Sequence, residues 1–196
     1  MDVNAVLDDL VAEQQALDAV VAPLAPEQWS LQTPSPRWTI ADQIGHLTFF
    51  DTTAALAITD PPAFVEHRGE MIRALGDDLA ADEVTLGSFR TLAPVEQLTE
   101  WRHRREALET AARTLTDDAR IEWYGPSMGA KSFLTARLME VWAHGQDICD
   151  TVDAQRPATD RLRHIAQLGV ITRGWSYVVR GEEPPDTPVH VELTAP

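Results

Sequence analysis

Cysteine is almost absent from this 196-residue chain, in which Cys149 is the only one. A single thiol excludes an intrachain disulfide framework and any zinc site built from several cysteines. Cys149 follows His144 by five residues, which corresponds to about 500° of helix rotation, so its side chain turns away from the His144 face. We therefore interpret Cys149 as a small buried thiol rather than as a nucleophile.

Long apolar runs and basic residues are also scarce. No window approaches about 18 uninterrupted apolar residues, and residues 1–4 lack the basic, apolar start of a secretory signal, so we expect a cytoplasmic protein. Lysine and arginine total 16 against 31 acidic residues, which gives a formal net charge of -15. Because this charge repels phosphate backbones and anionic lipids, we expect neither nucleic acid nor a membrane as a partner.

Several familiar catalytic motifs are missing. The sequence contains no His-Glu-x-x-His, no Gly-x-Ser-x-Gly and no glycine-rich phosphate loop. It also lacks the two Glu-x-x-His motifs from which di-iron bundles are built. Any metal site should therefore be mononuclear.

Helical periodicity dominates the chain up to about residue 180. Apolar residues recur at three- and four-residue steps, Thr39 and Asp42 form a variant of the capping box, and Pro94 stands where the first turn of a helix is expected. The pattern predicts an all-α protein. The predicted helices span about residues 3–21, 39–60, 62–75, 94–115, 130–151 and 158–180, with a broken, partly helical crossover over 76–92 and a loop over 121–129.

The last part of the chain changes character after the helix-breaking residues 181–185. Residues 188–194 alternate as in a β-strand, but no second strand pattern follows. An isolated strand is unstable, so we expect it to pair elsewhere or to mark where a larger protein would continue. We predict a metal-binding helical domain over 1–181 and, over 182–196, a tail or the start of a truncated C-terminal α/β region.

Acidic residues stand four positions before a histidine at four places, a spacing that puts both side chains on one face of a helix. The four pairs are Asp42/His46, Glu140/His144, Asp160/His164 and Asp186/His190. An acidic chain produces such pairs partly by chance, so context must choose among them. Glu140 and His144 border the apolar stripe of the helix predicted over 130–151, and His46 lies two turns into another helix. Together they offer one carboxylate and two imidazoles, the ligand set of a catalytic zinc centre with an open position.

Structural roles compete with this hypothesis. His46 by itself is more simply explained as a core-edge histidine bonded to a carbonyl group or to Asp42. Glu140 and His144 could be an ordinary hydrogen-bonded helix pair. A carboxylate beside an apolar stripe is costly to bury without a cation, which either Arg137 or a metal ion could supply.

Two runs of sequence resemble the N-terminal domain of the mycothiol-dependent maleylpyruvate isomerases, which belongs to the DinB-like metalloprotein superfamily. They are WTIADQIGHL at 38–47 and RLMEVWAHGQD at 137–147. The resemblance covers about residues 5–180. It implies a four-helix bundle with an up-down-down-up path, extra short helices in the long connection over 60–93, and His46, Glu140 and His144 as metal ligands.

The resemblance also implies a function. Zinc is the expected ion and mycothiol the expected thiol cosubstrate, whose thiolate would attack a small electrophile in a transferase or isomerase reaction. In the isomerases an α/β domain follows the bundle and helps to form the active site. Asp42 and Asp147 each lie one turn from a ligand histidine and are candidate acceptors for a ring N–H. Arg137 is a candidate to neutralise a substrate carboxylate or to fix Glu140.

Two other functions fit the same residues. An open metal site could activate water and hydrolyse an amide or an ester. A metal-containing module could also bind small electrophiles without turnover. The enzyme, the hydrolase and the binding module would all bind a small molecule, and the first would also bind a low-molecular-weight thiol. A homodimer is also possible, formed through exposed helix faces.

Overall fold

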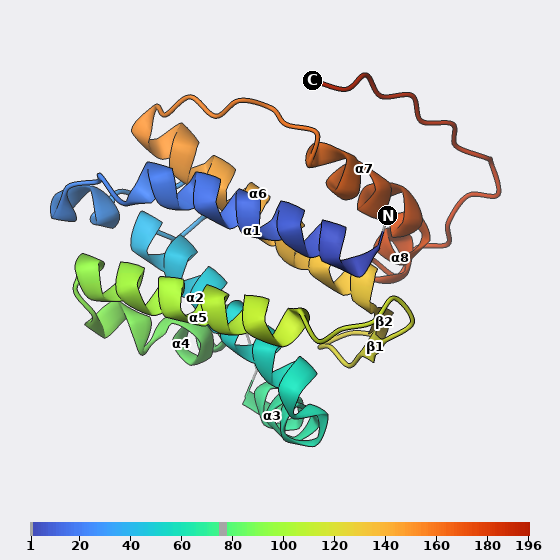
Figure 1. Cartoon of the computed structure of the whole chain (residues 1–196), viewed down its shortest axis with the longest axis horizontal. Helices are drawn as coiled ribbons and strands as arrows, with labels where there is room; N and C mark the ends of the chain where they lie inside the picture. The colour runs from blue at the N-terminus through green and yellow to red at the C-terminus, as the bar shows by residue number, and fades with distance from the viewer. Residues whose placement is uncertain (1, 75–77) are drawn as a thin grey trace. The chain divides into compact units, whose positions relative to one another are not determined.

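The computed structural model describes residues 2–74 and 78–196, which divide into the compact units Met1–Arg156 and Pro157–Pro196 (Figure 1). In that part of the chain, no helix is both long enough and apolar enough to cross a lipid bilayer. The elements of the first unit are α1 Val3–Val21, the 3₁₀ helix η1 Pro26–Ser30, α2 Ile40–Thr59, α3 Pro61–Ala74, α4 Asp78–Leu86, the 3₁₀ helix η2 Phe89–Thr91, α5 Pro94–Ala112, β1 Arg120–Ile121, β2 Met128–Gly129 and α6 Ala130–Val152.

The four long helices α1, α2, α5 and α6 form the predicted bundle. Asp117 accepts a hydrogen bond from the backbone of Val3 and pairs with Lys131, so α1 and α6 begin at the same end. Arg90, just before α5, pairs with Asp42 at the start of α2, so these two helices also begin together. Helices α2 and α6 run antiparallel, because Gln43, His46 and Asp51 of α2 contact His144, Glu140 and Arg137 of α6 in that order. The path is therefore up-down-down-up, as expected.

Local signals explain where α2 and α5 begin. The Thr39 hydroxyl accepts from the backbone N–H of Asp42 at 3.3 Å, and the Asp42 carboxylate accepts from the backbone N–H of Thr39 at 2.9 Å. This reciprocal pair confirms the predicted capping box. Pro94 occupies the first turn of α5, where its missing N–H leaves no bond unmade.

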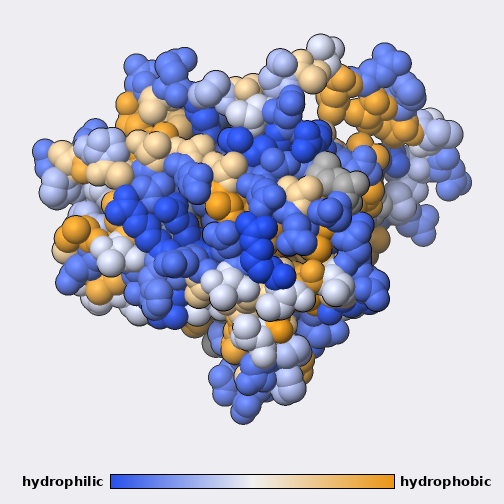
Figure 2. All heavy atoms as spheres, viewed as in Figure 1, coloured by the Kyte–Doolittle hydropathy of each residue, from blue (hydrophilic) through white to orange (hydrophobic). Residues whose placement is uncertain are grey.

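The core of the first unit is apolar and receives side chains from all four bundle helices. Each fully buried large aliphatic or aromatic side chain contributes about 1.5–3 kcal/mol relative to an exposed one. The buried residues include Leu7, Leu10, Ile44, Leu47, Trp101, Leu108, Leu134 and Leu138. On the face drawn in Figure 2, hydrophilic residues predominate and hydrophobic ones lie between them singly or in small groups, in keeping with the acidic composition.

Two connections differ in detail from expectation. The segment predicted as a loop over 121–129 belongs to a short antiparallel hairpin. In this hairpin Arg120 pairs with Gly129 and Ile121 with Met128, and the residues between the two strands form the turn. Strands of two residues are too short to show an alternating pattern, so the sequence carried no signal for them. The helix predicted over 62–75 is found as α3, and the crossover predicted over 76–92 contains α4 and η2. The predicted boundary between them, at residues 75 and 76, lies outside the described residues.

The second unit, Pro157–Pro196, corrects one further expectation. The single helix predicted over 158–180 is wrong, because the helical part is divided at Thr172 into α7 Leu162–Ile171 and α8 Arg173–Val178. Residues 188–194 form no strand in the described structure of this unit, since no neighbouring strand supplies the hydrogen bonds that their pattern requires. The predicted division at residue 181 stays a prediction.

Candidate metal centre

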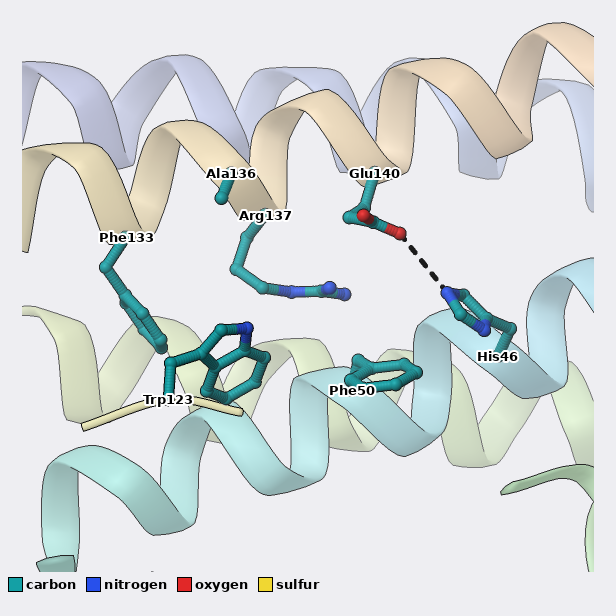
Figure 3. A pocket seen from close by; sticks show the side chains of 7 residues that line it. All are labelled: His46, Phe50, Trp123, Phe133, Ala136, Arg137 and Glu140. Atoms are coloured by element: carbon teal, nitrogen blue, oxygen red, sulfur yellow. Dashed lines mark hydrogen bonds and ion pairs between the residues drawn. The ribbon is translucent and has the colours of Figure 1, made fainter. Parts of the chain in front are cut away.

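The three predicted ligands come from two antiparallel helices and meet at one point. Glu140 Oε2 lies 3.2 Å from His46 Nε2 and 3.1 Å from His144 Nε2. One ligand atom from each residue falls within 4.8 Å of the other two, and among the described residues no other set of three or more histidine, cysteine, aspartate or glutamate side chains does so. Figure 3 shows Glu140 and His46 pointing toward one another from α6 and α2.

Burial and polar contacts together set the pKa values of two of these side chains. Burial lowers the pKa of His46 to about 4, aided by the charges of His144 and Arg137 and opposed by the hydrogen bond to Glu140. Burial works against ionisation of Glu140, yet its interactions with the nearby ring nitrogens of His144 and His46 outweigh it and hold the pKa of this carboxyl well below its usual range. At neutral pH the centre therefore contains an ionised carboxylate and a neutral His46, as metal binding requires.

Gln43 determines how His144 is oriented. The Gln43 amide nitrogen donates to Thr33 Oγ1 at 2.9 Å and to Asp147 Oδ2 at 3.1 Å, so its oxygen must face the opposite way. That oxygen lies 2.5 Å from His144 Nδ1 and accepts its proton. Ser35 donates to the same oxygen of Asp147 at 2.6 Å and completes the chain of bonds.

This chain of bonds has a chemical consequence for Glu140. When neutral His144 donates its proton from Nδ1 to Gln43, its Nε2 carries a lone pair. The lone pair points at the Glu140 carboxylate oxygen 3.1 Å away. Two electron-rich atoms remain this close only with a proton or a cation between them. The donor set thus fits a divalent ion of the zinc type.

Gln43 was not among the residues predicted to form the site. This side chain is fully buried, and it lies one turn before His46 on α2. The clue in the sequence was a glutamine one helical turn before a ligand histidine. It could not be interpreted without knowing that His144, 101 positions away, lies opposite.

The structure gives Asp42 and Asp147 places beside the centre rather than on the imidazoles. Asp42 caps α2 and accepts from Arg90 Nε at 2.7 Å. Asp147 holds Gln43 and thereby acts on His144 through one intermediary. Both carboxylates stabilise the local arrangement of α2.

Arg137 pairs with a carboxylate that the sequence analysis did not single out. Its Nη2 donates to Asp51 Oδ1 at 2.9 Å and its Nε to the same oxygen at 3.3 Å. Gln14 donates to the other oxygen of Asp51 at 3.3 Å. Burial raises the pKa of Asp51, and the charge and hydrogen bonds of Arg137 oppose that shift. Three bundle helices are joined in this buried cluster.

Aromatic rings surround the imidazoles. The Trp38 ring centroid lies 4.9 Å from that of His46 and 5.7 Å from that of His144, and Phe50 lies 4.6 Å from His46. Trp38 is held in place by the bond from its Nε1 to Asp82 Oδ1 in α4, at 3.1 Å. The crossover between α2 and α5 therefore contributes to the centre by fixing the ring that covers both histidines.

A cavity of about 110 Å³ opens beside Glu140 and His46 (Figure 3). Trp123, at the tip of the β1–β2 hairpin, forms one wall, and no sequence pattern pointed to it. The other residues that line the cavity are Phe50, Phe133, Ala136 and Arg137. A small molecule in this space would touch the candidate ligands directly.

Comparison with known proteins agrees with this architecture. The family model described as the mycothiol maleylpyruvate isomerase N-terminal domain matches residues 10–149. Two uncharacterized proteins of Mycobacterium tuberculosis, from strains CDC 1551 / Oshkosh and ATCC 25618 / H37Rv, are each 43% identical to this chain over 188 residues, which cover 96% of the chain and 72% of each relative.

Two crystal structures show a similar fold. That of the mycothiol-dependent maleylpyruvate isomerase matches with a TM-score of 0.65 at 16% identity, and that of a variant with one histidine replaced by alanine with a TM-score of 0.69 at 15% identity. Each match covers 93% of this chain and 73% of the isomerase chain. At such low identity the likeness establishes the fold, whereas the family model covers most of the chain. This chain therefore belongs to the mycothiol maleylpyruvate isomerase N-terminal domain family.

Proposed function

We propose that this protein is a zinc-dependent enzyme that uses mycothiol to transfer a thiol to a small electrophile or to isomerise it. The observation that carries the proposal is the meeting of the His46, Glu140 and His144 donor atoms, in which His144 Nε2 lies 3.1 Å from Glu140 Oε2. Membership of the family supports mycothiol as the thiol.

Each part of the centre has a task in this chemistry. A bound zinc ion would act as a Lewis acid that lowers the pKa of a thiol at its open position. Glu140 balances part of the ion's charge, and Gln43 keeps the Nε2 lone pair of His144 available. Trp38 and Phe50 shield the imidazoles from water, and the adjoining cavity places the electrophile within reach.

Elemental analysis tests the ligand set. The purified protein should contain about one zinc ion per chain, and both His46→Ala and Glu140→Ala should lose it. His103→Ala is the matched control, because His103 is an exposed histidine on α5. Retention of wild-type zinc by both ligand variants would show that the ion binds elsewhere.

A second assay separates the possible reactions. The zinc-loaded protein is incubated with mycothiol and a panel of small electrophiles that includes maleylpyruvate. Consumption of thiol indicates transfer, and conversion of maleylpyruvate without net thiol loss indicates isomerisation. Loss of substrate that does not depend on thiol would favour a hydrolase. Saturable binding without any turnover would favour a binding module, and either result would overturn the proposal.

A further inference from the structure

The cavity beside the candidate metal centre is lined by Arg137, a charged side chain that can bind a ligand. Arg137 enters the cavity from α6, and Figure 3 shows the guanidinium extending between Phe133 and Trp123 on one side and Glu140 and His46 on the other. Its Nε and Nη2 are bonded to Asp51. Among residues 2–74 and 78–196, no acceptor is recorded for Nη1. A guanidinium nitrogen that lines an aromatic-walled cavity favours a ligand that brings an acceptor.

Charge selects an anion for this position. Asp51 balances Arg137 and Glu140 faces the proposed ion, so a divalent ion and Arg137 together exceed the two carboxylates by one positive charge. The remaining walls are aromatic or small and carry no charge. A carboxylate matches a guanidinium in both charge and geometry.

The walls also limit the shape of the ligand. Trp123 and Phe133 meet edge to face with centroids 5.1 Å apart, and Phe50 lies 6.2 Å from Trp123. The volume of about 110 Å³ is smaller than the roughly 150 Å³ of an apolar cavity that holds benzene. Because this cavity is open on one side, it suits a flat body no larger than one aromatic ring, with part of that body outside the walls.

We propose that this cavity binds a small, flat carboxylic acid, with its carboxylate on Arg137 Nη1 and its body between Phe50, Trp123 and Phe133. The inference deepens the proposed function, on which it rests in taking this acid to be the class of electrophile that the enzyme uses. Arg137 thus serves both as the partner of Asp51 and as the anchor of the substrate.

Calorimetric titration of the zinc-loaded full chain tests the assignment without thiol or turnover. Benzoate should bind at least about tenfold more tightly than benzamide, its neutral analogue, because a hydrogen bond to a charged group is stronger than one to a neutral group. The larger 2-naphthoate should bind at least about tenfold more weakly than benzoate, because the cavity is too small for it. Equal affinity for acid and amide would overturn the anionic assignment, and tight binding of 2-naphthoate would overturn the size limit.

A cavity-filling variant locates the site. Ala136 lines the cavity and is half-buried on α6, so Ala136→Leu should fill the space and weaken benzoate binding by about tenfold or more. Ala143→Leu is the matched control, since Ala143 is half-buried on the same helix but does not line the cavity. Unchanged affinity in a folded Ala136→Leu protein would place the acid elsewhere. Substituting Arg137 is less informative, because its loss also leaves Asp51 without its cation.

Removing zinc separates the two possible anchors. Without the ion, the two carboxylates outnumber Arg137 by one negative charge, so benzoate should bind the zinc-free protein more weakly than the zinc-loaded one. If Arg137 holds the carboxylate, a measurable preference for benzoate over benzamide still remains, because the bond to Nη1 does not involve the ion. If the preference disappears with the metal, the ion binds the carboxylate and the Arg137 assignment is wrong. Selective benzoate binding by a protein with no thiol chemistry would uphold the carboxylate site at Arg137 while rejecting the proposed function, so the two can fail independently.

Discussion

Helices α2 and α6 carry two polar clusters side by side, one buried and one half-buried, and the clusters are built in opposite ways. In one, Asp51 faces the guanidinium of Arg137, so the protein supplies both charges. In the other, Glu140 faces His46 and His144, which offer ring nitrogens and no permanent cation. The first cluster contains its own cation, whereas the second is a candidate metal site. Burial of a carboxylate is therefore a weaker sign of function than the absence of a fixed cation opposite it.

The two imidazoles of the second cluster also differ from one another. His144 is oriented by a chain of hydrogen bonds through Gln43 to Asp147. His46 has Glu140 as its recorded hydrogen-bond partner and is otherwise packed between Trp38 and Phe50. One ligand is fixed by directional bonds and the other by the shape of its surroundings.

Breaking the first cluster should have the largest effect. Asp51→Ala leaves the buried Arg137 charge without its partner and should lower the free energy of unfolding by about 3–5 kcal/mol. Chemical denaturation of the zinc-free protein measures the loss, with Asp150→Ala, an exposed position on α6, as the control. A loss below about 1 kcal/mol would mean that the pair adds no more than a typical surface ion pair.

The second cluster should make the zinc-free protein sensitive to acid. The pKa of His46 is about 4 in the folded state and about 6.5 in the unfolded state, so the unfolded chain binds more protons between these values. The free energy of unfolding should therefore fall as the pH is lowered from about 6.5 to about 4, by up to roughly 3 kcal/mol. Denaturation curves across this range measure the change. His46→Gln should show a flatter profile, and identical profiles would show that His46 is not desolvated.

Disconnecting His144 should weaken metal binding while leaving all three ligands in place. Gln43→Ala removes the acceptor that fixes the ring, and zinc affinity should fall by about 10- to 100-fold. A competition titration against a chelator measures the change. Gln146→Ala is the control, since Gln146 lies on α6 and bonds to Asp150 instead. Wild-type affinity in Gln43→Ala would show that ring packing alone orients His144.

Removing the aromatic cover should have the smallest effect. Trp38→Ala deletes the ring that contacts both imidazoles, and an aromatic pair of this kind contributes about 0.5–1.5 kcal/mol, so zinc affinity should fall by about two- to tenfold. The same competition titration applies, and Trp175→Ala, at an exposed tryptophan of α8, serves as the control. A larger decrease in zinc affinity than that of Gln43→Ala would show that the Trp38 ring contributes more to zinc binding than the hydrogen bond from His144 to Gln43.

Much of the bundle was predictable because its signals are local. The capping box at Thr39 and Pro94 at the start of α5 act within one helical turn, and both are found as expected. Local sequence patterns did not predict the structure of segments that depend on distant partners. Residues 188–194 alternate in sequence as a β-strand would, but they do not form one. The strands β1 and β2 do form, but they are too short to show an alternating sequence.

The sequence by itself determined the four long helices and put Glu140 and His144 one turn apart, because helix periodicity and capping depend on residues a few positions away. Only the tertiary structure decided that Gln43 orients His144 and that Arg137 pairs with Asp51, over separations of 101 and 86 positions. The same holds for Trp123 as a wall of the cavity. These contacts follow from how α2, α6 and the hairpin pack against one another, and many side chains along each helix are chemically able to make them.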